Sequence, residues 1–332
     1  MPQRLDRRLR ILRGKRTLRL YPERLRAQEA AVRTKAERRV RTWLRQGRPV
    51  VLLTPRWSAP TRFLDDIQLD LAVGAPRVVA RALSIAPLGG RPLYESWGWL
   101  IKALTEFLGI DLGATAAQAV NRQGFRAVIG QILDRSLALK PHALLIHSAE
   151  HLPMEAREDF IAAYQEHAAS AGSRRRFTPL IASSVEGPTF EIEGASRLVL
   201  PDFAHGEAIE ALAEFVGASE LARLERVLEF VGGVPALIEQ IGADAERSNR
   251  LLGDRESIWR ALGALGDELR GAVAIADGVD GLAQRIEQLA RGSEVLDERV
   301  DTFLLRAGLA ERLASSRVGL RAPLFADVPA GR

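Results

Sequence analysis

The feature that most constrains this chain is a buried apolar run that leads through a polar loop into a helix. Residues 49–53 (PVVLL) predict a short strand covered on both faces, because every side chain in the run is apolar. Residues 64–72 have the apolar spacing of a helix. The sequence therefore predicts a strand-to-helix junction at residues 54–61 (TPRWSAPT).

A nucleotide-binding loop at such a junction would read G-x-x-x-x-G-K-[ST]. In this alignment Thr54 replaces the first Gly, Ala59 the second and Pro60 the Lys, and only Thr61 matches. The glycines of such a loop let backbone N–H groups converge on phosphate, and the lysine brings positive charge. Because Pro60 supplies neither a charge nor an N–H group, we expect no nucleotide hydrolysis here. Restoring Gly, Gly and Lys at the three altered positions is expected to destabilise the fold.

A second apolar run, residues 143–153 (ALLIHSAEHLP), also ends in polar residues. In P-loop ATPases the matching strand ends in Asp-Glu, where the Asp holds Mg²⁺ and the Glu orients the attacking water. The residues at these two positions are His147 and Ser148. A neutral histidine is a poor Mg²⁺ ligand, and serine is no general base at neutral pH. We therefore expect no catalytic residues and no bound cofactor.

The order of segments resembles AAA+ type ATPases, in the branch of the archaeal-type ATPases and the signal-transducing (STAND-like) NTPases and, more distantly, the origin-recognition proteins. The later segments that carry this resemblance are a second strand (78–85), a strand in the place of the sensor strand (176–184), a last strand (197–203), a G-G-x-P segment (231–237) and two winged-helix segments (304–309 and 318–325).

The resemblance implies an α/β fold: a P-loop AAA+-like parallel sheet core with a helical lid, a C-terminal winged helix and a basic N-terminal helical arm. The expected boundaries are 1–48 for the arm, 49–200 for the core, 201–253 for the lid and 254–332 for the winged helix. With both motifs altered, the resemblance implies a pseudo-ATPase, a nucleic-acid-binding or scaffold subunit of an assembly of the mobile-element or defence type. A protein-only signalling adaptor and an ATPase with an unorthodox loop remain as alternatives.

The charge is unevenly distributed along the chain. Residues 1–48 contain 17 Lys or Arg against four Asp or Glu, a net charge of +13, whereas the whole chain carries +5. Delocalised, fork-shaped arginine side chains suit phosphate, so the arm predicts a contact to a nucleic-acid backbone with little sequence specificity. The residues expected to make this contact are Arg4, Arg7, Arg8, Arg10, Arg13, Lys15, Arg16 and Arg19.

Two other interpretations of the arm stay open, docking on an acidic protein surface and plain solvated charge. Residues 23–46 predict a helix in which Leu25, Val32, Ala36, Val40 and Trp43 form one apolar stripe. This stripe is expected to pack, and the arginines of the helix are expected to face outward.

The winged-helix segment is a weaker candidate for DNA contact. The helix expected to enter a groove, residues 296–307, presents Asp297, Glu298, Arg299 and Asp301. An acidic face repels phosphate, so this domain is expected to serve mainly in protein contacts or in locking the lid.

Composition excludes several classes of function. The chain has no cysteine, which excludes disulfides and thiol chemistry, and it has only five histidines. Residues 147–151 (HSAEH) match the inverted zinc-peptidase pattern H-x-x-E-H, but that geometry needs a helix where a strand is predicted, so no metal site is expected. The sequence has no run of 18 apolar residues and no signal peptide, so we expect a cytoplasmic protein with no membrane contact.

Overall fold

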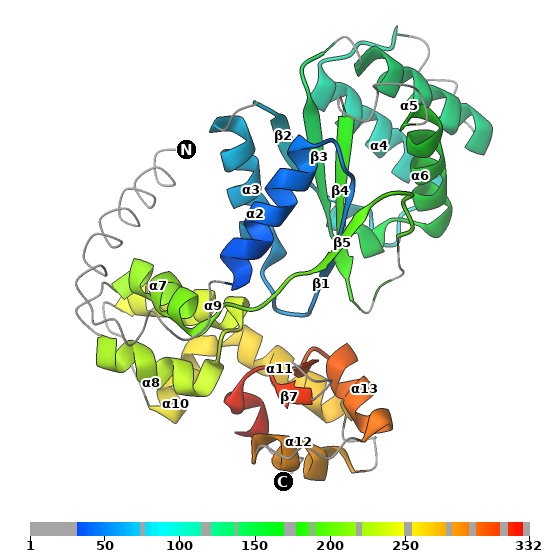
Figure 1. Cartoon of the computed structure of the whole chain (residues 1–332). Helices are drawn as coiled ribbons and strands as arrows, with labels where there is room; N and C mark the ends of the chain where they lie inside the picture. The colour runs from blue at the N-terminus through cyan, green and yellow to red at the C-terminus, as the bar shows by residue number, and fades with distance from the viewer. Residues whose placement is uncertain are drawn as a thin grey trace. The chain divides into compact units, whose positions relative to one another are not determined.

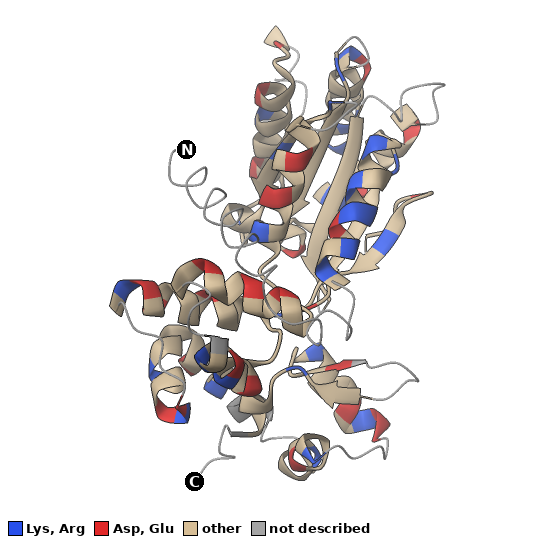
Figure 2. Cartoon of the chain, turned by 60° about the vertical axis from the view of Figure 1, so that its left-hand side comes forward, with Lys and Arg blue, Asp and Glu red and all other residues tan. Residues whose placement is uncertain are grey.

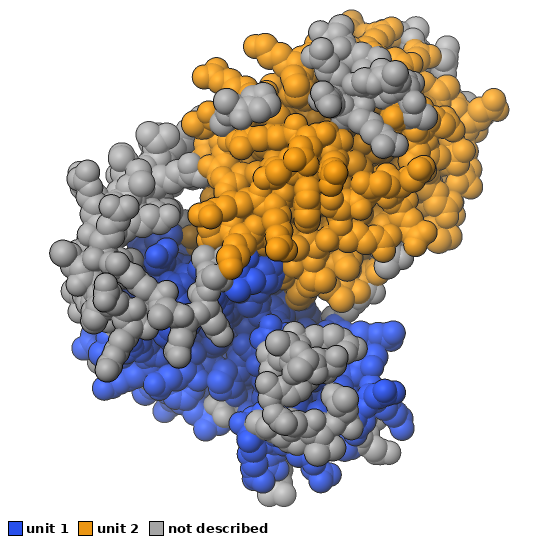
Figure 3. All heavy atoms as spheres, in the orientation of Figure 1, with its two compact units in different colours: residues 1–33, 56–58, 201–332 blue, residues 34–55, 59–200 orange. Residues whose placement is uncertain are grey.

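A computed structural model describes residues 32–73, 77–113, 121–136, 139–168, 177–185, 187, 190–216, 221–248, 254–276, 281–291, 297–312 and 318–327. The chain divides into two compact units, coloured separately in Figure 3. The sheet unit comprises residues 34–55 and 59–200. The C-terminal unit comprises residues 56–58 and 201–332, together with Val32 and Arg33.

The sheet unit is built on a five-stranded parallel sheet (Figure 1). Its strands are β1 (Val50–Thr54), β2 (Val79–Ser84), β3 (His142–His147), β4 (Phe177–Ser184) and β5 (Ser196–Val199). Their order is β2-β3-β4-β1-β5, and every neighbouring pair is parallel. The α/β fold with a P-loop AAA+-like parallel sheet core, which the sequence predicted, is confirmed.

Helices cover both faces of the sheet, which explains why its central strands read as unbroken apolar runs. One face packs against α2 (Val32–Arg45) and α3 (Pro60–Val73). The other packs against α4 (Leu93–Leu108), α5 (Arg122–Ser136) and α6 (Met154–Ala168). Alternate residues of one strand point to opposite layers: within β1, Leu52 joins the first layer and Val51 the second.

Helix α2 differs from the expected apolar stripe at one end. Ala36 and Val40 are buried as predicted, but Val32 is 45% exposed. Leu44, which lies outside the predicted stripe, is buried in the core. Trp43 packs at the edge of the same cluster. The helix joins the core of the sheet unit from residue 34 onward, so its inward face is set by contacts with β1 and α3.

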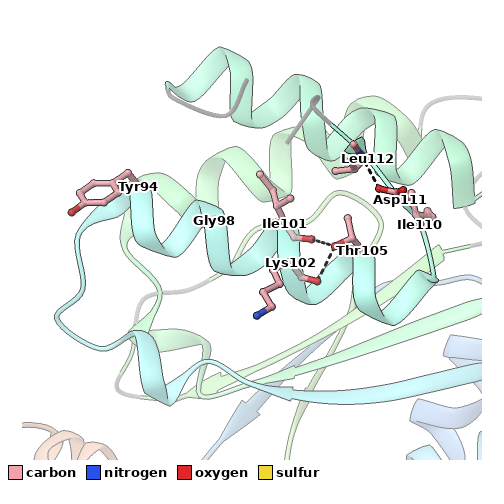
Figure 4. Close-up of a pocket in the computed structure, with 9 residues that line it drawn as sticks. Tyr94, Gly98, Ile101, Lys102, Thr105, Ile110, Asp111 and Leu112 are labelled. Atoms are coloured by element: carbon pink, nitrogen blue, oxygen red, sulfur yellow. Dashed lines mark hydrogen bonds between the residues drawn. The ribbon is translucent and has the colours of Figure 1, made fainter. Parts of the chain in front are cut away.

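One face of α4 forms a hollow of about 350 Å³ together with the turn that follows the helix (Figure 4). Thr105 lines it, and its hydroxyl donates to the carbonyls of Ile101 and Lys102, both at 2.9 Å. Asp111 accepts a hydrogen bond from the amide of Gly113 at 2.9 Å. The polar groups of this hollow are therefore largely used within the local chain.

The C-terminal unit is mainly helical. Its elements are α7 (His205–Val216), α8 (Leu221–Val231), α9 (Pro235–Ser248), α10 (Arg255–Leu262), α11 (Ala264–Ala276), α12 (Leu282–Ala290), α13 (Glu298–Arg306), β6 (Ala310–Arg312), β7 (Val318–Leu320) and a 3₁₀ turn (Pro323–Asp327). Strands β6 and β7 pair antiparallel. One apolar cluster extends from α7 to Phe325, so the segments predicted as lid and winged helix share a continuous core.

The acidic face predicted for α13 is wrong at one position. Asp301 is only 3% exposed, and its carboxylate accepts hydrogen bonds from Arg285 of α12 at 2.6 and 2.8 Å. Asp297 caps the helix by accepting from the amide of Val300. The local sequence shows the charge of Asp301 but not the distant arginine that neutralises it.

Charged residues are spread over the helices of both units (Figure 2). In the part of the chain that the structure describes, no helix has the length and apolar character needed to cross a bilayer.

Candidate functional site

The predicted motif residues of the sheet unit lie at the carboxyl ends of β1 and β3, at one edge of the parallel sheet. Strand β1 lies between β4 and β5, and β4 separates it from β3. Thr54 at the end of β1 is in register with Ser184 at the end of β4, and His147 ends β3. Ligands of open α/β sheets bind at this edge, so the fold places the altered motifs where a ligand site would be.

Thr54, at the carboxyl end of β1, is held in place by two hydrogen bonds to the β4 segment. Its side chain is buried, and its hydroxyl donates to the carbonyl of Ser183 at 2.9 Å. Its own carbonyl accepts from the amide of Val185 at 3.2 Å. A glycine here could not make the side-chain bond, so Thr54 links β1 to β4.

Helix α3 begins at Pro60, where a proline is well tolerated because the first helical N–H has no partner within the helix. Thr61, the one matching residue of the motif, is exposed. Ala59 has φ of 47°, a left-handed conformation that favours glycine. A glycine would adopt this conformation without strain, so the predicted destabilisation by the triple change would have to come from positions 54 and 60.

His147 and Ser148, which the sequence predicts to stand where an active ATPase has Asp-Glu, lie at the end of β3 and directly after it. Burial lowers the pKa of His147, and the charges of Asp65 and Glu150 offset only part of this effect. The histidine is therefore neutral at pH 7. Its Nδ1 lies 3.3 Å from the hydroxyl of Ser148, which has a left-handed φ of 57°.

Glu150 was missed as a member of this edge. Its carboxylate accepts a hydrogen bond from the amide of Ser184 at 3.1 Å, which ties the turn after β3 to the end of β4. Strand β3 continues to His147, and residues 149–151 form a 3₁₀ turn, so His147 and His151 do not share one helical face. Within the described ranges, no group of three His, Cys, Asp or Glu residues is arranged to hold a metal ion.

The apex of the loop, residues 56–58, belongs to the C-terminal unit. Hydrogen bonds to carbonyl oxygens hold it there at three consecutive residues. The carbonyl of Arg56 accepts from Arg321 at 2.6 Å, that of Trp57 from the amide of Ala236 at 3.0 Å, and that of Ser58 from Arg33 at 3.0 Å. The backbone of the apex is therefore built into the helical unit.

Trp57 anchors the apex through its side chain. It is 8% exposed, and its ring centroid lies 5.6 Å from that of Phe325. Its indole N–H donates to Glu268 at 3.1 Å, and the same carboxylate oxygen accepts two bonds from Arg56 at 2.9 and 3.1 Å. Trp57 has a φ of 62°, so the contacts of its side chain support a backbone conformation that is unfavourable for such a residue.

Arg321 connects the apex to the body of the C-terminal unit. Its guanidinium donates to both carboxylate oxygens of Asp202, at 2.6 and 2.8 Å, and to the carbonyl of Gly308 at 2.8 Å. A Cβ atom at Gly308 would lie 2.7 Å from Cβ of Arg56, so only glycine allows this approach. Arg321 is 6% exposed, and the ion pair is buried.

Arg33 performs a similar role from the N-terminal side. It is buried, and it donates to the carbonyls of Pro201 and Ser58 at 3.1 and 3.0 Å. Its guanidinium lies 4.9 Å from the centroid of the Phe203 ring. Sequence reasoning treated this arginine as part of an outward-facing basic arm and so missed it.

The residues predicted to contact nucleic acid lie outside the described part of the chain. These are Arg4, Arg7, Arg8, Arg10, Arg13, Lys15, Arg16 and Arg19.

Comparison with known proteins identifies relatives by structure. No protein-family model and no curated protein sequence matches the chain. A Walker-type ATPase of Pyrococcus abyssi has 13% identity and a TM-score of 0.57, with 91% of this chain and 96% of that chain covered. Cdc6p of Pyrobaculum aerophilum has 13% identity, a TM-score of 0.49, and 91% and 93% coverage. A RuvB mutant of Thermotoga maritima has 14% identity, a TM-score of 0.43, and 91% and 96% coverage. The chain thus has the fold of a Walker-type ATPase, and at this identity the likeness extends to the fold alone.

Proposed function

We propose that this protein is a non-catalytic, AAA+-like pseudo-ATPase that serves as a nucleic-acid-binding or scaffold subunit of a larger assembly, of the mobile-element or defence type. The observation that carries the proposal is the loop apex, whose three consecutive carbonyls accept hydrogen bonds within the C-terminal unit. A loop that binds phosphate through its backbone needs N–H groups turned toward the anion and a lysine beside them.

The residues around the loop support the same proposal. Pro60 begins α3 where the lysine would stand, and His147 ends β3 where a carboxylate would hold Mg²⁺. Glu150 is the nearest carboxylate along the chain, and it already accepts a hydrogen bond from the amide of Ser184. No group at these positions supplies both a metal ligand and a base for water.

One observation favours the alternative of an ATPase with an unorthodox loop. Trp57 and Ala59 both have positive φ, and left-handed residues in a turn can direct neighbouring N–H groups toward an anion. Phosphate binding by the loop, which this alternative requires, would follow from this conformation.

Calorimetric titration of the full chain with Mg-ATP, together with an ATP turnover assay, tests the proposal. We expect no hydrolysis and a dissociation constant above about 1 mM, which corresponds to about −4 kcal/mol of binding free energy or weaker. Inorganic phosphate is titrated in parallel as the smallest anion that the loop could hold. Micromolar binding of Mg-ATP would contradict the proposal even without turnover.

The nucleic-acid part of the proposal is supported by charge. Basic residues continue from the arm into α2, where Lys35, Arg38 and Arg39 are exposed. If no nucleic acid binds at low salt, the result supports the alternative function of a protein-only signalling adaptor.

A further inference from the structure

A hollow of about 600 Å³ opens on the sheet unit, and one stripe of α6 forms much of its wall. The lining residues of α6 recur three or four positions apart, from Met154 to Gln165. Helix α5 adds Arg126, and the segment after β4 adds Phe190. None of these residues belongs to the strand-to-helix junction or to the loop apex, so the hollow is independent of the proposed function.

Arg157 lines this hollow and is the unusual residue in it. It is only 8% exposed, and its buried Nε has no hydrogen-bond partner among the residues that the structure describes. Burial lowers the pKa of the guanidinium, and the charges of Glu158 and Glu155 offset only part of that effect. A buried guanidinium Nε without a hydrogen-bond partner is unfavourable, so the retention of Arg157 in the wall of the hollow points to a further partner for its guanidinium.

The acidic residues next to Arg157 on α6 are engaged with other arginines. Asp159 is fully buried and accepts hydrogen bonds from Arg122 at 3.0 Å and from Arg126 at 2.8 Å. Glu158 accepts from the same Arg122 at 3.1 Å. These contacts neutralise Arg122 and Arg126 of α5 and leave Arg157 of α6 in the wall of the hollow.

Part of the wall of the hollow beside Arg157 is apolar. The guanidinium carbon of Arg157 lies 5.2 Å from the centroid of the Phe190 ring, and Met154 and Ile161 add aliphatic surface. A volume of about 600 Å³ matches that of small-molecule sites, which are mostly apolar with a few polar groups that orient the ligand. Glu158 and Glu191 also line the hollow, and their negative charge disfavours a dianion such as phosphate.

We propose that this hollow binds a small monocarboxylate with an apolar body, and that Arg157 receives the carboxylate. The planar guanidinium fork matches a carboxylate in geometry. The apolar body of the ligand would lie against Phe190, Met154 and Ile161, where it would exclude water from the ion pair.

The probe is 4-phenylbutyrate, titrated into the full chain and followed by calorimetry. We expect a dissociation constant of about 1 mM or below, the range that ligand efficiency sets for a molecule of this size. The neutral analogue 4-phenyl-1-butanol and the variant Arg157→Met should each reduce affinity at least about tenfold, because each removes one charge of the pair. The control variant Arg91→Met removes an exposed arginine of the same unit and should leave binding unchanged.

Thermal unfolding without ligand separates a binding role from a structural one. Arg157→Met keeps the length of the side chain against Phe190 but removes the buried guanidinium and its unsatisfied Nε, so the melting temperature should rise by a few degrees. The proposal is overturned by a lower melting temperature in the variant or by equal binding to the variant and the parent chain. It is likewise overturned by tighter binding of phenyl phosphate than of 4-phenylbutyrate, or by the absence of probe binding up to about 10 mM.

Discussion

Arg321 is the residue on which the loop apex depends most, because one guanidinium holds Asp202, Gly308 and the carbonyl of Arg56. Removing one partner of a buried ion pair leaves the other charge uncompensated. We expect Arg321→Gln to lower the free energy of unfolding by about 3–5 kcal/mol. Urea unfolding followed by tryptophan fluorescence measures the change. Arg270→Gln, at an exposed pair with Asp267, should change it by about 0.5 kcal/mol or less.

A second prediction concerns the backbone conformation of Ala59. Its left-handed φ is strained for alanine and relaxed for glycine, while glycine also raises the entropy of the unfolded chain. Ala59→Gly should therefore leave the free energy of unfolding unchanged or raise it by up to about 1 kcal/mol. Ala162→Gly within α6 is the control and should lower it by about 1 kcal/mol. A clear loss of stability at position 59 would contradict the assigned backbone conformation.

His147 predicts how stability changes with pH. Burial lowers the pKa of the folded state below the ordinary value of 6.5, so the unfolded chain binds more protons as the pH falls through 6.5. The free energy of unfolding should therefore fall as the pH is lowered from 7 to about 5. His147→Gln should make this fall shallower, measured by urea unfolding at several pH values. His142, whose pKa burial also lowers, contributes to the slope that remains, and an identical slope in the variant would refute the assignment.

Residues with a local signature were predictable, and residues defined by distant partners were not. Pro60 reads as a helix start because its fixed φ and missing N–H suit the first turn. Asp301 and Arg321 show only a charge in the sequence, and their partners lie 16 and 119 positions away. Trp57 could have indicated that the loop apex packs against a core. It is a large apolar side chain in a polar loop, and such a side chain is expected to be buried.

Helices α7 and α9 pack so closely that a glycine is required between them. A Cβ atom at Gly242 of α9 would lie 2.3 Å from the ring of Phe215 in α7. Gly242→Ala should lower the free energy of unfolding by about 1–3 kcal/mol, although alanine is the better helix former. Gly271→Ala in α11 is the matched control, because its Cβ would meet nothing within 4 Å, and it should raise stability by about 0.5–1 kcal/mol. Both are read from thermal or urea unfolding, and equal effects at the two positions would rule out the close packing.

Elements were predicted best where burial is complete on both sides. β1, β3 and β4 are mainly apolar because helices cover both faces of the sheet. The bounds of β1 and β4 agree with the sequence to within about a residue, whereas the run at 143–153 continues past the end of β3. The sequence predicted α2 as a helix, but it did not predict the buried face of α2 correctly at both ends. Val32 was expected to be buried and is exposed, whereas Leu44, outside the predicted stripe, is buried. The spacing of apolar residues predicts which side of the helix is apolar. The shape of the surface that the helix packs against decides which turns of that side are buried.

At the scale of the whole molecule, the basic arm predicts a salt-dependent interaction with nucleic acid. If four to six arginines approach phosphates, the slope of log K against log salt on duplex DNA should be about −4 to −5, with weak sequence preference. Fluorescence anisotropy on one duplex and one single strand at several salt concentrations measures it. Deleting residues 1–20 should abolish most of the binding, whereas deleting residues 254–332 should weaken it modestly. Undiminished binding without residues 1–20 would favour the scaffold role.

The membership of residues 56–58 in the C-terminal unit has a consequence for how the gene can be divided. A fragment that starts after residue 200 would lack Trp57 and leave Phe325 and Glu268 without a neighbour that they contact. A fragment that ends at residue 200 would carry Trp57 without the groups that bury it. Neither unit is one uninterrupted stretch of the chain, so we expect that a gene fragment cut at residue 200 would encode a unit that lacks part of its own contacts.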